Sequence, residues 1–287
     1  MRLPDATIGE RILGAASIRA GECTHHSLLA PARAWRMLRI AALFLLFALF
    51  TAVVTAFASV RRRERFMRWW AGMVLRTLGV RLMCGRSPAF GAGPALLVAN
   101  HVSSIDPILI CAIQPACFVA KSELGNSAWL RWLLAEAGTI FIDRGRLGGV
   151  LSALSAMHEA FDAGERVALF PEATIHVTAE PRPFNSALLE PGSDGVPLYF
   201  VALSMTRADG TPSPEADFPR GYSFAAGFWR LAGVPALVAR AEVFGPFDFS
   251  GVNRKRIARS AHDTIHRALS GSATAPVLRK PALYAIR

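Results

Sequence analysis

The chain has 287 residues, 52% of them hydrophobic, and a formal net charge of +11. Its mean hydropathy of +0.33 is high for a soluble protein and low for a polytopic membrane protein, so a globular body with one hydrophobic anchor fits best. The sequence contains no helix-turn-helix, zinc-finger or RNP-type pattern, and we therefore expect no nucleic-acid partner despite the charge. The four cysteines show neither C-x-x-C spacing nor a disulfide framework.

The N-terminal region carries the expected anchor. Residues 1–32 form a tail to which we assign no structure, and residues 40–60 follow as an uncharged run long enough to cross a bilayer. A cleaved signal peptide is the competing interpretation, because Ala56-Phe57-Ala58 resembles a cleavage site. However, the run begins far into the chain and an arginine cluster follows it at once, which opposes export.

Arginines flank this run on both sides and favour attraction to anionic lipid headgroups. They are Arg33, Arg36 and Arg39 before it and Arg61, Arg62, Arg63, Arg65 and Arg68 after it. Within residues 61–82 the arginines alternate with apolar side chains, a pattern typical of an interfacial helix with Trp69 and Trp70 at headgroup depth. We therefore predict a pair of membrane-anchoring helices over residues 33–82, which either span the bilayer or dip into one leaflet. The denser arginines after the run predict an inner-membrane protein with its body on the cytoplasmic side.

Residues 83–271 are predicted to form an α/β domain, with a C-terminal tail over residues 272–287. After Gly91, short apolar runs alternate with helical stretches, which predicts a mixed, largely parallel sheet flanked by helices. The predicted strands are residues 95–99, 117–120, 139–142, 167–170, 196–203 and 236–243, and the predicted helices are residues 108–113, 127–137, 148–163 and 252–269. Gly164 and Gly271 follow the last two helices as C-terminal caps.

The stretch LLVANHVSSIDPILI, residues 96–110, predicts a tight turn between a buried strand and a helix. Asp106 followed by Pro107 is a helix-start pattern, with the carboxylate at the N-cap. The turn would bring this carboxylate back toward the imidazole of His101, which makes a base and the group that orients it. The alternative is that Asp106 only caps the helix and His101 is an ordinary loop residue.

Polar groups also follow three other predicted strands. Lys121 ends the second, Arg144 follows the third and Glu172 follows the fourth. Because sheets of this kind place their chemistry at the carboxyl ends of the strands, we expect these groups to share one rim with His101. An oriented histidine can take a proton from a hydroxyl, and an arginine suits a phosphate or carboxylate. With no G-x-S-x-G elbow and no Walker loop in the sequence, direct acyl transfer to a bound hydroxyl fits best.

Four sequence blocks resemble those of a known family. NHVSSID, GTIFIDR, LFPEAT and VPLYFVAL occur in the order, and at about the spacing, of the blocks of the glycerolipid acyltransferases, which include the 1-acylglycerol-3-phosphate acyltransferases. The resemblance covers residues 94–203, and the predicted N-terminal helices are similar to the family's two-helix anchor.

The resemblance implies a mechanism and a set of site residues. His101 would be the general base on the acceptor hydroxyl and Asp106 its orienting partner. The hydroxyl would attack the thioester of acyl-CoA or acyl-carrier protein, with no covalent acyl-enzyme, no metal and no cofactor. With 1-acylglycerol-3-phosphate as the acceptor, the product would be phosphatidic acid. The implied acceptor-binding residues are Arg144, Glu172, Ala173, Thr174 and Lys121.

Two departures from the family pattern both affect the acceptor side. Ala173 replaces the glycine usual in the third block, and the later stretch FNSALL, residues 184–189, lacks the family's basic residue. We therefore expect acyl transfer to an unusual acceptor. Residues 221–247 are loosely similar to bacterial ornithine-lipid acyltransferases, whose acceptor carries no phosphate, so a lyso-ornithine lipid is the alternative acceptor. Two further alternatives are a catalytically silent lipid-binding homologue and a hydrolase that activates water.

Some remaining side chains are interpreted as structural. Trp129 and Trp132, with their neighbouring leucines, predict a helix packed in the core, with an acyl-chain wall or membrane contact as the alternative. Cys111 and Cys117 are expected in the core. His262 and His266 share a helix face, but no third metal ligand accompanies them.

Overall fold

The fold is described from a computed structural model of the chain. It describes residues 30–54, 59–85, 90–122, 127–143, 147–172, 181–216 and 224–271. Nearly all of the predicted N-terminal tail and the whole C-terminal tail lie outside these residues.

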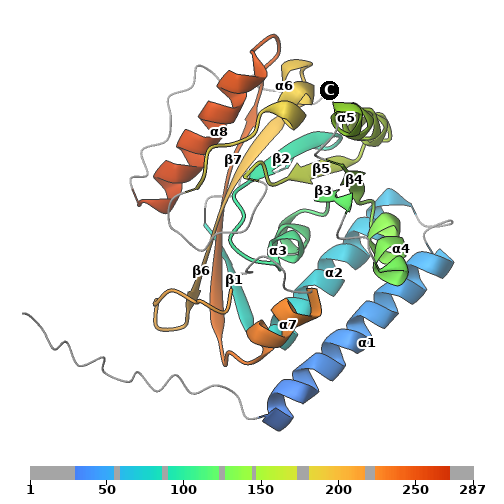
Figure 1. The fold of residues 1–287 in the computed structure, drawn as a ribbon, viewed down its shortest axis with the longest axis vertical. Helices are drawn as coiled ribbons and strands as arrows, with labels where there is room; N and C mark the ends of the chain where they lie inside the picture. Colours follow the sequence, from blue (N-terminus) through green and yellow to red (C-terminus); the bar gives the residue numbers. More distant parts are fainter. Residues whose placement is uncertain are drawn as a thin grey trace, which may run out of the picture.

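A twisted sheet forms the centre of the domain (Figure 1). Within the described residues its strands are β1 (Val80–Cys84), β2 (Ala95–Ala99), β3 (Cys117–Lys121), β4 (Ile140–Ile142), β5 (Arg166–Leu169), β6 (Leu198–Arg207) and β7 (Leu237–Phe247), in the order β1-β7-β6-β2-β5-β3-β4. β6 and β7 are antiparallel, and the other neighbouring pairs are parallel. The predicted mixed, largely parallel sheet is confirmed, with the fully buried β2 at its centre.

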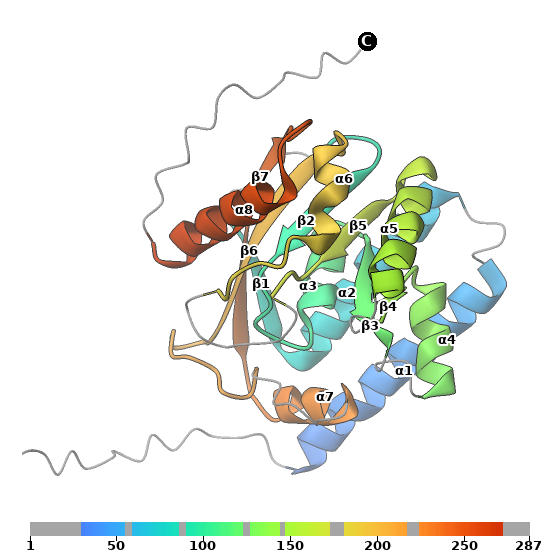
Figure 2. The same ribbon diagram turned by 45° about the horizontal axis from the view of Figure 1, so that its top comes forward.

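Helices cover both faces of the sheet. Figures 1 and 2 show α5 (Leu147–Asp162), α6 (Glu190–Ser193) and α8 (Arg254–Leu269) on one face and α3 (Asp106–Ile113), backed by α2 (Val60–Leu78), on the other. Buried side chains of α5 and α8 pack with those of β2, β5 and β6 in one cluster, and α2 and α3 share another with α1 (Ala30–Val54) and α7 (Phe224–Ala232). α4 (Ala128–Glu136) lies near α1 (Figure 2). The helix α7 was not among the predicted elements.

The prediction of a single helix over residues 61–82 is wrong at its C-terminal end. α2 ends at Leu78 with Gly79 as its C-cap, and the chain continues as the edge strand β1, which pairs with β7. Gly79 has a φ of 74°, and a Cβ at this position would lie 2.7 Å from the carbonyl oxygen of Pro235. The left-handed cap at Gly79 reverses the chain. Periodicity alone does not reveal this reversal, because the apolar residues of β1 continue the pattern of the helix.

Two of the arginines expected at lipid headgroups instead join α1 to the domain. The guanidinium of Arg36 donates to the carbonyl oxygens of Leu78 at 3.2 Å, Val234 at 2.6 Å and Pro235 at 2.9 Å. Arg33 donates to the carbonyl oxygen of Trp229 at 2.7 Å and lies 4.2 Å from the centroid of its ring. These contacts connect the N-terminal half of α1 to the end of α2 and to the α7 region.

The first helix has the length and composition of a membrane-spanning segment. Residues Ala30–Val53 have a mean hydropathy of 2.0 in the most apolar window, and only 17% of that window is buried in the protein. Its exposed face carries Trp35, Leu38, Leu45 and Leu49. α2 differs, because most of its apolar face is buried: Trp70 is 6% exposed and its Nε1 donates to the carbonyl oxygen of Leu43 at 2.8 Å. Trp70 is therefore packed inside the protein and does not face lipid headgroups as predicted, whereas Trp69 is exposed.

Candidate active site

The candidate site lies at the carboxyl end of β2, the central strand. Asn100, the residue after this strand, is buried and continues the strand pairing with its side chain. Its Nδ2 donates to the carbonyl oxygen of Leu203 at 2.8 Å and its Oδ1 accepts the backbone N–H of Leu203 at 2.7 Å. The side-chain amide thus attaches the end of β2 to β6 and fixes where the following turn begins.

The turn brings together the two residues that were predicted to act as base and orienting group. His101 Nδ1 lies 2.7 Å from Asp106 Oδ2, and the same oxygen accepts the backbone N–H groups of Val102 and Ser103 at 2.7 Å and 2.8 Å. Asp106 is fully buried, whereas 18% of the His101 side chain is exposed. The imidazole also stacks on Phe170, with ring centroids 4.2 Å apart. With Nδ1 held by the carboxylate, Nε2 is the nitrogen left to accept a proton.

The expectation that Asp106 caps the helix is corrected by one position. The N-cap is Ile105, and Asp106 is the first residue of α3, followed by Pro107. Its carboxylate turns back to residues 101–103 and not forward to the N–H groups of α3. Three donors converge on one oxygen, so this side chain organises the turn, which excludes the alternative of a cap beside an unrelated loop histidine.

Glu172 lies beside the same turn. Its Oε1 accepts the backbone N–H of His101 at 3.1 Å, and its Oε2 accepts the backbone N–H of Arg182 at 3.2 Å. The side chain is buried, and burial raises the pKa of the carboxyl group above its usual range, although the two N–H donors and the nearby His101 partly oppose this shift. The sequence correctly predicts that Glu172 lies near His101.

An apolar cavity opens at the His101 side chain. It has a volume of about 200 Å³ and extends between α1, α2, α3 and α4. Its lining, apart from His101, Ser104 and Thr139, is hydrophobic: Phe44, Phe47, Met67, Trp70, Pro107, Ile108, Cys111, Phe118, Ala120, Leu130, Leu133, Leu134 and Ala137. A cavity lined in this way suits a hydrocarbon chain whose reactive end meets the imidazole.

The structure of α4 differs from the prediction that its tryptophans pack in the core. Trp129 and Trp132 are 63% and 43% exposed, whereas Leu133 is buried. The leucines of this helix line the cavity beside His101, and the tryptophans face outward. Leucines at a cavity and outward tryptophans are compatible with the alternative interpretations, an acyl-chain wall or a membrane contact, which stay predictions.

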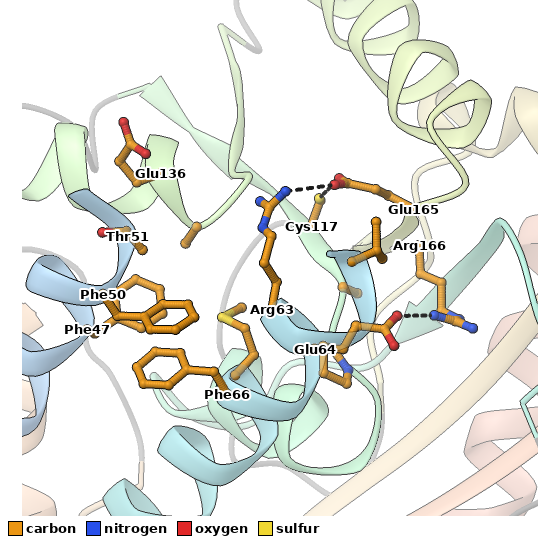
Figure 3. A pocket seen from close by; sticks show the side chains of 15 residues that line it. Phe47, Phe50, Thr51, Arg63, Glu64, Phe66, Cys117, Glu136, Glu165 and Arg166 are labelled. Atoms are coloured by element: carbon orange, nitrogen blue, oxygen red, sulfur yellow. Dashed lines mark hydrogen bonds and ion pairs between the residues drawn. The ribbon is translucent and has the colours of Figure 1, made fainter. Parts of the chain in front are cut away.

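A smaller cavity of about 70 Å³ adjoins the first one, and Figure 3 shows the residues that line it. Phe47, Met67 and Ala137 line both cavities and therefore form the partition between them. Figure 3 shows the phenylalanines on one side and two ion pairs on the other, Arg63–Glu165 at 3.7 Å and Glu64–Arg166 at 2.7 Å. The smaller cavity therefore has an aromatic wall and a charged wall.

A third cavity, of about 100 Å³, lies on the opposite face of the sheet next to β3, β4 and β5. Phe170 and Pro171 form part of its wall, and the FNSALL stretch contributes Asn185, Ala187 and Leu188. The side chain of Asn185 is uncharged and accepts the backbone N–H of Ala187 at 2.8 Å. The stretch that lacks the family's basic residue thus shares one neighbour with His101, because Phe170 lines this cavity and also stacks on the imidazole.

The other predicted site residues are less directly connected to the turn. Lys121 is exposed at the end of β3, opposite Ile142 of β4, so it lies on the expected rim of the sheet. Arg144, Ala173 and Thr174 lie outside the described residues. His262 and His266 stack with ring centroids 6.1 Å apart, and His262 Nε2 contacts the carbonyl oxygen of Pro181 at 3.0 Å. Among the residues that the structure describes, no cluster of three or more His, Cys, Asp or Glu side chains could hold a metal.

Two residues of the site were missed by sequence reasoning. Phe170 supports the imidazole, and Asn100 anchors the turn to β6. Each directly follows an apolar strand, Asn100 one residue before His101 and Phe170 two residues before Glu172, which is a signal that the sequence contains. Their partners come from strands distant in sequence, so the specific contacts required the fold.

Comparisons with known proteins identify a family and several relatives. The chain matches the Acyltransferase family model over residues 53–199. It is 30% identical over 222 residues to a lyso-ornithine lipid O-acyltransferase of Pseudomonas aeruginosa, an alignment that covers 77% of this chain and 84% of that protein. It is 28% identical over 170 residues to a 1-acyl-sn-glycerol-3-phosphate acyltransferase of Neisseria meningitidis, covering 59% of this chain and 66% of that protein.

The fold is also similar to a solved structure. The crystal structure of the 1-acyl-sn-glycerophosphate acyltransferase PlsC from Thermotoga maritima superposes with a TM-score of 0.59 at 17% identity, covering 83% of this chain and 97% of that one. At this identity the likeness concerns the fold alone. The extent of the family match and the similarity to the Pseudomonas protein show that this chain belongs to the Acyltransferase family.

Proposed function

We propose that this protein is a membrane-bound lysolipid O-acyltransferase in which His101 is the general base. The observation that carries the proposal is the His101–Asp106 pair, 2.7 Å apart, at the mouth of an apolar cavity of about 200 Å³. A base that is oriented by a carboxylate and faces a hydrocarbon-lined space has the parts needed to transfer an acyl chain. The donor is an acyl thioester, acyl-CoA or acyl-carrier protein, and the reaction needs no other cofactor.

The proposed reaction proceeds in two steps. The acceptor hydroxyl gives its proton to His101 Nε2 while its oxygen attacks the thioester carbonyl carbon, which produces a tetrahedral intermediate. The intermediate then collapses, the carbon–sulfur bond breaks, and the imidazolium returns the proton to the departing thiolate. Asp106 keeps the proton of Nδ1 on the far side of the ring and stabilises the imidazolium, as the carboxylate does in a Ser-His-Asp triad.

We propose a phosphate-free, zwitterionic lysolipid such as lyso-ornithine lipid as the acceptor. The FNSALL stretch supports this choice, because it has Asn185 where the family pattern has a basic residue, at a cavity lined in part by Phe170, whose ring also stacks on His101. An uncharged amide offers no counter-ion to a phosphate. Proteins named lyso-ornithine lipid O-acyltransferase in Pseudomonas aeruginosa and Brucella abortus are among the relatives.

The second candidate acceptor is 1-acylglycerol-3-phosphate. Relatives in two Neisseria species carry that activity in their names, and Lys121 lies on the rim of the sheet. Under this candidate, Lys121 and Arg144 would hold the phosphate and the product would be phosphatidic acid. For either acceptor we place the protein at the inner membrane with its catalytic domain on the cytoplasmic side, anchored by α1.

The test is acyl transfer by membranes that contain the full chain, supplied with a labelled acyl thioester and a panel of lysolipids. Product with lyso-ornithine lipid that depends on His101, as judged by His101→Ala, supports the proposal. Asn185→Lys, with Asn185→Gln as its uncharged control, should raise the rate with 1-acylglycerol-3-phosphate if this position discriminates against phosphate. Binding of lysolipid without any His101-dependent product would instead identify a silent lipid-binding homologue, and release of free fatty acid would identify a hydrolase.

A further inference from the structure

In the turn that carries His101, the backbone N–H groups of three consecutive residues, 101–103, all donate to carboxylates. Those of Val102 and Ser103 donate to Asp106, and that of His101 donates to Glu172 at 3.1 Å. Charge-assisted hydrogen bonds of this kind are stronger than neutral ones and fix backbone direction. The base therefore lies on a segment whose position is set by acidic side chains from two places in the sequence.

Glu172 connects this turn to a second segment. While its Oε1 accepts the N–H of His101, its Oε2 accepts the N–H of Arg182 at 3.2 Å. The segment after Arg182 leads to Asn185, whose N–H donates to the carbonyl oxygen of Pro171 at 3.1 Å and whose side chain lies at the third cavity. One carboxylate thus joins the base-bearing turn to the stretch proposed to face the acceptor.

The burial of Glu172 argues against contact with the acceptor headgroup. Only 8% of the residue is exposed, so little of it is accessible to a ligand. A carboxylate buried to this extent needs hydrogen-bond donors, and the two backbone N–H groups supply them from within the protein. Each of its two oxygens is already an acceptor of a charge-assisted bond.

We propose that Glu172 is a positioning residue for the catalytic base and does not hold the acceptor headgroup. It sets the position of the His101 backbone, and through it the direction of Nε2 toward the acceptor hydroxyl, while Phe170 supports the face of the ring. The inference rests on the proposed function, because it assigns a role relative to His101 as the base. A displacement of a reacting group by about 1 Å can cost about 100-fold in rate, so the turn needs such an anchor.

The first test is Glu172→Gln. One amide oxygen replaces two carboxylate oxygens, so at most one of the two backbone N–H groups keeps an acceptor in place. We expect kcat to fall about 10- to 100-fold while the acceptor KM changes less than about threefold. Glu190→Gln is the matched control, because Glu190 is an exposed carboxylate paired with Arg254, and its kcat and KM should equal those of the parent protein.

The second test removes a donor without changing Glu172. Arg182 lies between Pro181 and Pro183, so Arg182→Pro deletes the N–H that donates to Oε2 in a segment already restricted to extended backbone. Arg182→Ala removes the same side chain but keeps the N–H. We expect kcat of the proline variant to be at least about threefold below that of the alanine variant, at similar acceptor KM.

Hydrogen exchange gives a readout that does not depend on turnover. In Glu172→Gln, at least one of the amides of His101 and Arg182 should exchange faster, whereas those of β2 should be unchanged. A rise in acceptor KM at unchanged kcat would overturn the proposal and return Glu172 to the acceptor site. Unchanged exchange at both amides would also overturn it. If the parent protein transfers acyl chains to no acceptor, the proposed function fails, and the exchange measurement still decides whether Glu172 holds the turn.

Discussion

Asp106 Oδ2 and His101 Nδ1 lie 2.7 Å apart, and the same oxygen accepts the backbone N–H groups of Val102 and Ser103. One buried atom therefore orients the imidazole and also holds the backbone of the turn that carries it. The two residues are five positions apart in the sequence. This spacing allows α3 to begin at Asp106 and the preceding turn to bring His101 against the carboxylate of that residue.

Replacing this carboxylate should impair both catalysis and stability. In Asp106→Asn, the amide competes for the position of Oδ2 and favours the wrong imidazole tautomer, and we expect the rate of acyl transfer to fall by about 10³- to 10⁴-fold. The buried N–H groups of Val102 and Ser103 would also lose their charged acceptor, and this should lower the unfolding free energy by about 1–3 kcal/mol. Initial rates and thermal melts in detergent test both effects. Asp263→Asn, at an exposed carboxylate on α8, is the control. If Asp106→Asn transferred acyl chains at a rate within threefold of the parent protein, the role assigned to Asp106 would be contradicted.

The partition between the two adjoining cavities should limit the length of the acyl chain. Ala137 lines both cavities, so Ala137→Leu adds side-chain volume at the partition between them. We expect the preferred donor to become shorter by about two to three methylenes, because each buried CH₂ contributes about 0.8 kcal/mol only while it fits. Competition between acyl thioesters of different length measures the shift.

Ala135→Leu is the control for this prediction, since Ala135 is exposed on the same helix. An unchanged chain preference in the Ala137 variant would show that the acyl chain ends elsewhere.

The attachment of α1 should depend on Arg36 and not on its neighbour Arg39. Arg36→Ala removes donors to the carbonyl oxygens of Leu78, Val234 and Pro235, and we expect the unfolding free energy to fall by about 2–4 kcal/mol. Arg39 is exposed, so Arg39→Ala should change the unfolding free energy by less than about 0.5 kcal/mol. Equal effects of the two substitutions on thermal unfolding would show that these arginines act mainly through lipid headgroups.

The buried thiols should be unreactive over the physiological pH range. Burial raises the pKa of Cys111 to about 12 and, together with the Glu165 carboxylate, raises the pKa of Cys117 well above its usual range. A raised pKa leaves less of the reactive thiolate at any given pH, so iodoacetamide at pH 8 should leave both residues unmodified in the folded protein. Peptide mass analysis before and after denaturation measures this, and rapid modification of Cys111 before denaturation would contradict the burial of α3.

Local sequence information was sufficient for many of the elements. The apolar run before Asn100 and the Asp106-Pro107 pair both encode their structures within a few residues, so the strand, the turn and the close approach of His101 to Asp106 were predictable. The edge strand β1 was not, because its short alternating stretch extends the helical pattern of α2, and only pairing with β7 selects the extended conformation. α7 was missed, and its buried Phe228 and Leu231 pack in the cluster that also includes α1.

The sequence by itself determined the chemical groups and the carboxyl ends of the strands at which His101, Lys121 and Glu172 lie, since these follow from periodicity and from residue type at strand ends. Only the tertiary structure decided what each group contacts. Glu172 reaches the N–H of His101, Arg36 reaches carbonyl oxygens of α2 and of the α7 region, and the leucines of α4 line a cavity while its tryptophans face outward. These contacts join residues far apart in the chain, and their geometry comes from the packing of helices on both faces of the sheet.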